Sequence, residues 1–466
     1  MTQSVLPLPD LEALRRAADP LADDVIARLM DAWDDDQPEA AHCKHECNFD
    51  ILSVVTRQME QWKTNGQLAQ WRASGVDPKV AAELEAYVAA GLPLPAWADT
   101  AKIERAEALF VDFGMLSCTL LFCSSLPECY VIPDLAAVLH VAGQLEQRTE
   151  YRIRSTAAMI FPVMMVGGLT RPDGGGLAQV LKVRLIHATI RHLILRGNPE
   201  RVRQLDYVPP LPSDGKGNLH HELFTLGWNI AEDGVPCSQD ELAYTLLTFG
   251  YVFLRSLRKL GLALPKDDEE AYLHAWNVMG HVLGMETTLM AHTMAEAETL
   301  FTALQKRGRA QTYEPDPRPA LGNALMRTMQ NVIPLQVLKP FPVLLTRHLC
   351  GKTTARNIGI DHRVPFISRW LFIALMLVAR SIDFTVRLVF KQFSMCRMIT
   401  RVVGYQFTCK VLMDQTRPLK LPETLLNQMT AMTCDWHQDP KAPAWVNKLE
   451  QRLTGRKPDP VEGAQA

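Results

Sequence analysis

The chain has 466 residues, 47% of them hydrophobic, and 49 Lys and Arg residues stand against 51 Asp and Glu residues. This composition excludes a wholly disordered chain, and the balanced charge gives no basic surplus for nucleic acid. The 10 Cys are too sparse for a disulfide scaffold and predict a reducing compartment. Arg15 and Arg16 are not followed by an apolar stretch, so we expect no secretory signal and a cytoplasmic protein.

Helical patterns dominate the chain. We expect an N-terminal helical region at 1–129, and the next region, 130–306, carries the clearest helical periodicity. We predict helices there at 177–195, 238–260 and 269–283. The sequence GGLTRPDGGG, which precedes the first of them, predicts a flexible connection. No alternating strand pattern with hairpin turns is present, so the fold class is predicted to be all-α.

The C-terminal third begins after a predicted linker at 307–320. A helical region packed on the core is expected at 321–454, with a disordered tail at 455–466. Residues 366–408 are strongly apolar, but seven charged residues interrupt them and the longest uncharged run has ten residues. A membrane span needs about 20 apolar residues. We favour a buried core helix or helical hairpin, and the alternative is an amphipathic surface that meets a membrane or a lipophilic substrate.

Common catalytic motifs are missing. The chain has no Cys-x-x-Cys-His for covalent haem attachment, no nucleophile elbow, no phosphate-binding loop and no His-Glu-x-x-His zinc motif. These absences leave helix-borne single residues as the candidates for chemistry.

The most informative segment is Lys-Val-Arg-Leu-Ile-His-Ala-Thr-Ile-Arg-His at 182–192. Arg184, His187 and Arg191 are three and four residues apart, so they lie near one face of a helix. His187 among Ile, Ala and Leu is compatible with a satisfied core histidine. The functional alternative is an imidazole ligand to iron, with Arg184 and Arg191 as partners of anionic propionates.

Upstream, Arg152 and Thr156 are four residues apart at the start of an apolar segment. The two arginines of this segment, Arg152 and Arg154, are unusual for a pure core. They are also compatible with an exposed helix entrance.

Together these segments resemble the catalytic domain shared by latex clearing proteins (rubber oxygenases) and MpaB-type oxygenases. The motifs are Arg-x-x-x-Thr at 152–156, Val-Arg-Leu-Ile-His-Ala-x-x-Arg-His at 183–192, and the helix entrances at 234–250 and 270–284. The resemblance implies a globin-like, all-α core at 130–306 that holds non-covalent haem b, with additional N- and C-terminal helices. It implies that His187 is the proximal iron ligand, that Arg152 and Thr156 lie near the distal side, and that Thr245 lies near the haem pocket.

Two positions depart from the family pattern. Ser155 stands where rubber oxygenases carry a lysine, and Ala136 falls where an acidic residue is expected. The resemblance therefore predicts a haem b-dependent oxygenase that uses dioxygen on a lipophilic substrate, such as an isoprenoid or another alkene. The alternatives are a non-catalytic haem sensor or carrier, and a haem-free helical protein that interacts with lipid. Peripheral membrane contact and the oligomeric state stay open, and no nucleic-acid partner is expected.

Overall fold

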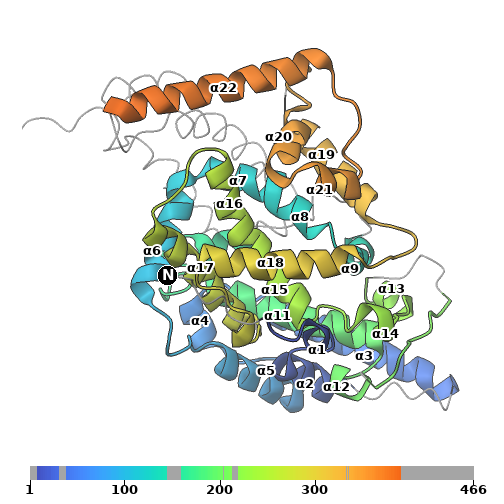
Figure 1. The fold of residues 1–466 in the computed structure, drawn as a ribbon. Coiled ribbons are helices and arrows are strands. Elements are labelled where there is room, and N and C mark those ends of the chain that lie inside the picture. The colour runs from blue at the N-terminus through green and yellow to red at the C-terminus, as the bar shows by residue number, and fades with distance from the viewer. Residues whose placement is uncertain are drawn as a thin grey trace, which may run out of the picture.

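Helices make up the regular structure of this computed structural model (Figure 1). The structure describes residues 8–30, 38–143, 159–202, 204–212, 219–331, 333 and 335–389. Within these residues there is no strand, and Val208 and Trp228 form one isolated antiparallel bridge. The all-α prediction is confirmed for the described residues, and the globin-like character of the core stays a prediction.

The N-terminal part consists of short and medium helices. They are α1 (Leu11–Arg15), α2 (Pro20–Leu29), α3 (Pro38–Met59), α4 (Asn65–Ala69), α5 (Pro78–Gly91), α6 (Thr100–Phe113), α7 (Met115–Leu120), the π-helical turn η1 (Leu121–Ser125) and α8 (Leu126–Cys129). The middle part carries α9 (Pro133–Gly143), α11 (Gly176–Leu195), α12 (Pro199–Val202), α13 (Leu219–Thr225), α14 (Ile230–Asp233), α15 (Gln239–Phe249), α16 (Tyr251–Lys259), α17 (Lys266–Val282), the 3₁₀ turn η2 (Thr287–Leu289) and α18 (Met294–Arg309). The last described helices are α19 (Arg318–Asn331), α20 (Phe341–Cys350), α21 (Lys352–Asn357) and α22 (Phe366–Val389).

Helix α11 lies inside the molecule, in contact with α2, α13 and α17. Its apolar residues, including Val180, Leu181 and Leu185, recur at helical spacing and are buried. The predicted helix at 177–195 is therefore confirmed. The predicted helix at 269–283 corresponds to α17.

The glycine-rich connection before α11 is held by hydrogen bonds, so the prediction of a flexible connection is wrong. Asn65 donates to the carbonyls of Gly168 and Arg171 at 2.9 Å each and accepts from the amide of Leu177. The Glu107 carboxylate accepts from the amide of Gly167 at 2.7 Å. A Cβ at Gly168 would lie 2.2 Å from a backbone carbonyl oxygen, so glycine is needed for close backbone approach here.

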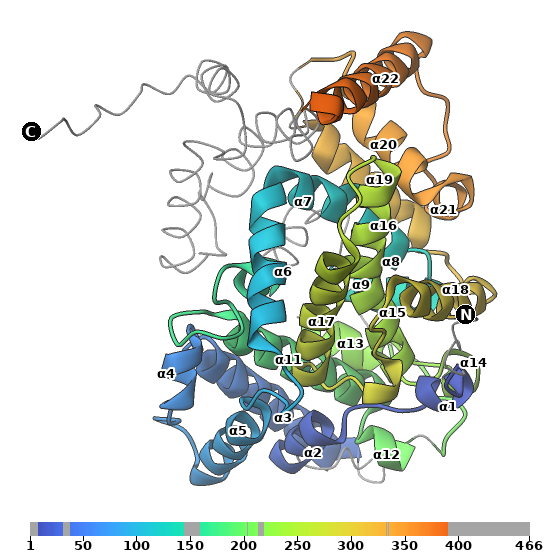
Figure 2. The ribbon, with the colours of Figure 1, turned by 60° about the vertical axis from the view of Figure 1, so that its left-hand side comes forward.

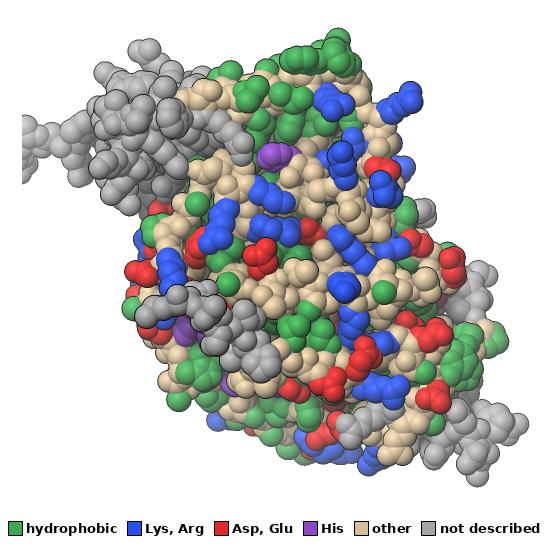
Figure 3. All heavy atoms as spheres, viewed as in Figure 1, with side chains coloured by type: hydrophobic (Ala, Val, Ile, Leu, Met, Phe, Trp, Pro, Cys, Tyr) green, Lys and Arg blue, Asp and Glu red, His purple; other side chains and the backbone are tan. Residues whose placement is uncertain are grey.

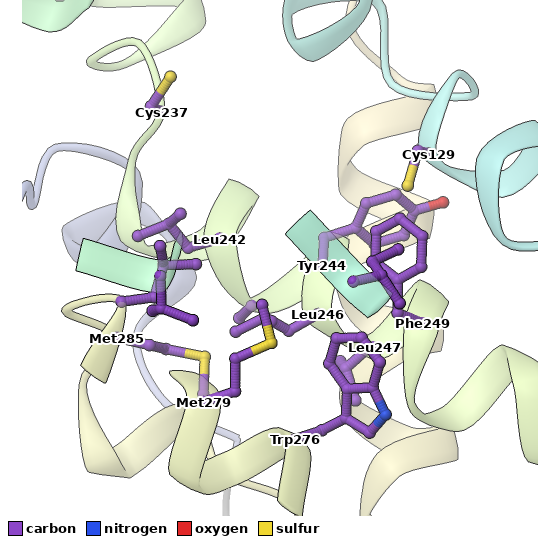
Figure 4. Close-up of a cluster of buried hydrophobic side chains, with 14 of the residues drawn as sticks. Cys129, Cys237, Leu242, Tyr244, Leu246, Leu247, Phe249, Trp276, Met279 and Met285 are labelled. Atoms are coloured by element: carbon purple, nitrogen blue, oxygen red, sulfur yellow. The ribbon is translucent and has the colours of Figure 1, made fainter. Parts of the chain in front are cut away.

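Helices α6 and α15 both pack on α17, which in turn contacts α11. Helices α6 and α17 run side by side (Figure 2). Leu246 of α15, Met279 of α17 and the adjacent Met285 gather in one apolar cluster, and Trp276 stacks on Phe249 with ring centroids 5.7 Å apart (Figure 4). The predicted helix at 238–260 is interrupted at Gly250, where a Cβ would approach Trp276 to 3.3 Å, and it forms α15 and α16.

The carboxylate of Glu128 joins four helices. It lies at the end of α8 and is 1% exposed. It accepts hydrogen bonds from Arg255 of α16 at 2.6 Å, Gln305 of α18 at 2.8 Å and Thr354 of α21 at 3.0 Å. This network attaches the short helix α21 to the centre of the molecule.

Helix α22 corrects the favoured sequence interpretation of the apolar C-terminal segment. The described side chains from Phe366 to Val378 are mostly exposed, so this part is not a buried core helix. Among the described helices none alone is long and apolar enough to span a membrane. The pair Thr100–Phe113 and Leu116–Cys129 meets that test only jointly, across a 90° bend.

Candidate functional site

His187 is the first element of the candidate site. It lies on α11 between the exposed Ile186 and the buried Ala188, and the residue as a whole is half-buried. Burial, and secondarily the positive charge of Arg191, lowers the pKa of His187 to about 3. The imidazole is therefore neutral at physiological pH, which is the form that binds a metal ion. Its Nδ1 atom is buried and has no hydrogen-bond partner among the described residues.

Apolar side chains also lie next to His187 on α11. Val183 lies four residues before it and Ile190 three residues after it, so the three side chains share one face. All three are half-buried, although most of the helix is buried. This face can contact a flat apolar group without further polar partners.

His192 differs from His187 in its surroundings. Its side chain is 4% exposed, and burial lowers its pKa to about 4. It lies five residues after His187 and so points to another side of the helix. His192 therefore serves as a matched internal control for any role assigned to His187.

Two buried ion pairs attach α11 to α2. Arg184 donates from Nε and Nη2 to the two carboxylate oxygens of Asp19 at 2.6 Å each, and from Nη1 to the Val282 carbonyl at 3.1 Å. Arg191 donates from Nε to Asp23 at 2.8 Å and from Nη1 to the Cys237 carbonyl at 2.8 Å. These pairs fix the helix that carries His187.

The two arginines differ in what remains free. The Nε and both terminal nitrogens of Arg184 are engaged by protein oxygens. The Nη2 of Arg191 is buried and has no partner among the described residues. It therefore offers an unused donor one helical turn from His187. The predicted contacts of both arginines with propionates stay predictions.

Asp19 and Asp23 are the residues that sequence reasoning missed. They are four residues apart at the start of α2, and both are buried. Burial raises the pKa of Asp23 to about 6, and the adjacent Arg191 opposes that rise. The sequence does contain two acidic residues one helical turn apart and, far along the chain, two arginines two turns apart. Nothing in either segment indicates that the two helices are in contact, so the ion pairs could not be predicted.

Gly284 closes the site on the α17 side. Its φ of +94° is in the region that favours glycine, and a Cβ there would lie 2.6 Å from the Asp19 carboxylate and 2.9 Å from Arg184 Nε. The Gln239 amide donates to the carbonyls of Gly284 and Ala18 at 2.8 Å each. The ion pair of Asp19 is thus enclosed by backbone from two other segments.

Thr245 is half-buried in α15, whose other residues are all buried. It is thus more accessible than its neighbours in the helix, and its predicted position near a haem pocket stays a prediction. Arg152, Ser155 and Thr156 lie outside the described residues. Within the part of the chain that the structure describes, no group of three or more His, Cys, Asp and Glu residues could hold a metal ion, so His187 stands as a single candidate ligand.

Comparison with known proteins supports one family. Residues 130–381 match the family model described as "ER-bound oxygenase mpaB/B'/Rubber oxygenase, catalytic domain". A rubber oxygenase of Streptomyces sp. (strain K30) is 23% identical over 314 residues, which cover 66% of this chain and 67% of that protein. The structure of latex clearing protein in its closed state has a TM-score of 0.60 at 19% identity, covering 88% of this chain and 94% of the other, and shows the shared fold. The chain therefore belongs to the mpaB and rubber oxygenase catalytic-domain family.

Proposed function

We propose that the protein is a haem b-dependent oxygenase that uses dioxygen on a lipophilic substrate, such as an isoprenoid or another alkene. The observation that carries the proposal is that His187 and Arg191, two residues of α11 with chemistry suited to a bound group, each have an unsatisfied buried nitrogen. His187 Nδ1 and Arg191 Nη2 are buried, have no partner among the described residues and belong to residues one turn apart. Buried polar atoms normally have partners, so this pair fits a site for a bound group.

The chemistry of these two residues fits haem. His187 supplies a neutral imidazole that would hold the iron, and Arg191 supplies a cationic donor suited to a propionate. When bound, haem would supply the redox centre that activates dioxygen. The family membership independently supports an oxygenase, and the rubber oxygenase among its relatives favours a polyisoprenoid or a related alkene as substrate.

The protein itself would position the imidazole of His187 and surround the bound group with apolar side chains. The pairs Arg184–Asp19 and Arg191–Asp23 hold α11 in place, so the imidazole is presented on a rigid element. Val183 and Ile190 provide apolar contact on the same face as His187. The resemblance assigns Arg152 and Thr156 to the distal side and Thr245 to the neighbourhood of the haem pocket, and these three assignments depend on the sequence match alone.

The test is the haem content and visible spectrum of the purified protein and of two variants. His187→Ala should lose most of the haem, because alanine cannot replace the directed bond of an imidazole to iron. His192→Ala is the control and should keep most of its haem. Full haem retention with an unchanged spectrum in His187→Ala would refute the assignment.

Turnover then separates an oxygenase from a haem carrier. The holoprotein should consume dioxygen in the presence of a polyisoprene emulsion or a short isoprenoid and should form oxygenated products. Haem binding without either result would favour the carrier.

A further inference from the structure

The outer side of α22 exposes a concentrated apolar surface. Phe366 is 72% exposed, Ile367 70%, Trp370 58% and Leu377 61%. Leu371, Ile373, Leu375 and Val378 are exposed as well. In soluble proteins, exposed apolar residues are usually scattered, and a contiguous group marks an interaction surface.

The inner side of α22 is attached to the protein. Phe372 and Met376, with the buried Ser368, lie four residues apart and form the packed face. The ring of Phe372 meets Phe341 of α20 at a centroid distance of 5.6 Å. The helix is therefore seated on α20 by a narrow strip at one end of the molecule (Figure 1). The apolar side chains outside this strip are exposed.

The segment around α22 is also strongly cationic. Residues 335–378 contain six Lys and Arg residues and a single acidic residue, Asp361, whereas the whole chain has a net charge of −2. Among the six, Arg363 precedes the helix and Arg369 lies in its first turn, and both are exposed. Lys and Arg side chains, drawn blue, gather beside the hydrophobic surface, drawn green, at this end of the molecule (Figure 3).

We propose that α22 is a membrane-docking helix that lies flat in the interfacial layer of a bilayer containing anionic lipids. An apolar face with adjoining cations is the pattern of helices that bind at membrane surfaces. The exposed part from Phe366 to Val378 is about 20 Å long at 1.5 Å per residue, which suits a helix lying along the surface. Trp370 is the residue type enriched at the membrane interface.

Charge favours this occupant over a second copy of the chain. Residues 335–378 carry six cations against one acidic residue, so a symmetric contact through this segment would place two net positive surfaces together, and like charges would oppose it. Anionic headgroups would instead neutralise them. The proposal goes beyond the oxygenase function and does not depend on haem, although a lipophilic substrate would partition into the same bilayer.

Flotation of the full-length protein with vesicles tests the proposal. Vesicles of phosphatidylcholine alone are compared with vesicles that also contain phosphatidylglycerol, at low and high salt. The wild-type protein should float with the anionic vesicles, and salt should release part of it. Phe366→Ser/Trp370→Ser should lose most of this binding.

Two further variants make the result specific. Arg363→Gln/Arg369→Gln should weaken binding to anionic vesicles by about fivefold per residue, about 25-fold in total, and leave binding to neutral vesicles unchanged. Leu205→Ser/Tyr207→Ser removes exposed apolar side chains elsewhere and should float like the wild type. All three variants should keep the wild-type unfolding midpoint, because the altered side chains are exposed.

Three results would overturn the proposal. One is a wild-type protein that does not float with anionic vesicles. Another is an apolar variant that floats as well as the wild type. The third is a wild-type dimer that the Phe366→Ser/Trp370→Ser variant converts to a monomer without lipid, which would make α22 a contact between copies.

Discussion

Removing the carboxylate of Asp19 should be far more costly than its single lost ion pair would suggest. Asp19→Ala deletes both 2.6 Å contacts to Arg184, whose side chain is 10% exposed, and leaves one hydrogen bond, to the Val282 carbonyl. A buried cation without its partner costs about 3–5 kcal/mol of folding free energy. Asp268→Ala is a matched control, because Asp268 accepts from Arg105 Nε and Nη2 at the same 2.6 Å. Arg105 is 47% exposed, so this loss should be about 0.2–1 kcal/mol.

The assay is denaturant unfolding of the two single variants and of Asp19→Leu/Arg184→Met. The double variant should recover most of the stability, because an apolar pair of similar volume often replaces a buried ion pair without loss. Asp19→Ala should also release haem more readily than Asp268→Ala, since α11 carries His187. An Asp19→Ala variant that is no less stable than Asp268→Ala would refute the reasoning from burial.

Gly284→Ala should destabilise the protein more than Gly261→Ala, because both have positive φ but only at Gly284 would the new Cβ meet a neighbour, the Asp19 carboxylate at 2.6 Å. Unfolding free energies decide this, and Gly261→Ala alone should cost about 1–2 kcal/mol. Burial raises the pKa of Glu107 to about 7, so the folded state binds its proton more tightly than the unfolded chain and stability from this group falls as pH rises from about 4.5 to 7. Glu107→Gln should flatten that part of the stability profile, and an unchanged slope would contradict the shift. Glu128→Ala should raise amide hydrogen exchange in α21 more than in α6, whereas a uniform rise would show that the network does not act locally.

Periodicity predicted the helices that carry long apolar repeats. The segment 177–195 became α11 and 269–283 became α17, because each repeat could be buried whole against its neighbours. The same reasoning failed at Phe366–Val378, where apolar content was taken to mean burial. Burial depends on what packs against a helix, and among the described side chains of Phe366–Val378 the strip through Phe372 is the part that meets α20. A sequence window cannot distinguish a helix with two covered faces from a helix with one.

In the candidate site, too, the features set by a single helix were predictable from the sequence, whereas the contacts between helices were not. The spacing of Arg184, His187 and Arg191 follows from helix geometry, so their grouping was predictable from the sequence. The partner of each arginine was not predictable, because a guanidinium binds an Asp or Glu carboxylate and a haem propionate equally well. Asp19 lies 165 residues from Arg184 and engages that guanidinium on two nitrogens, whereas Asp23 leaves Nη2 of Arg191 without a described partner. The two arginines therefore have different prospects as cofactor ligands: Arg191 retains a donor to offer, and Arg184 acts through the position it gives α11.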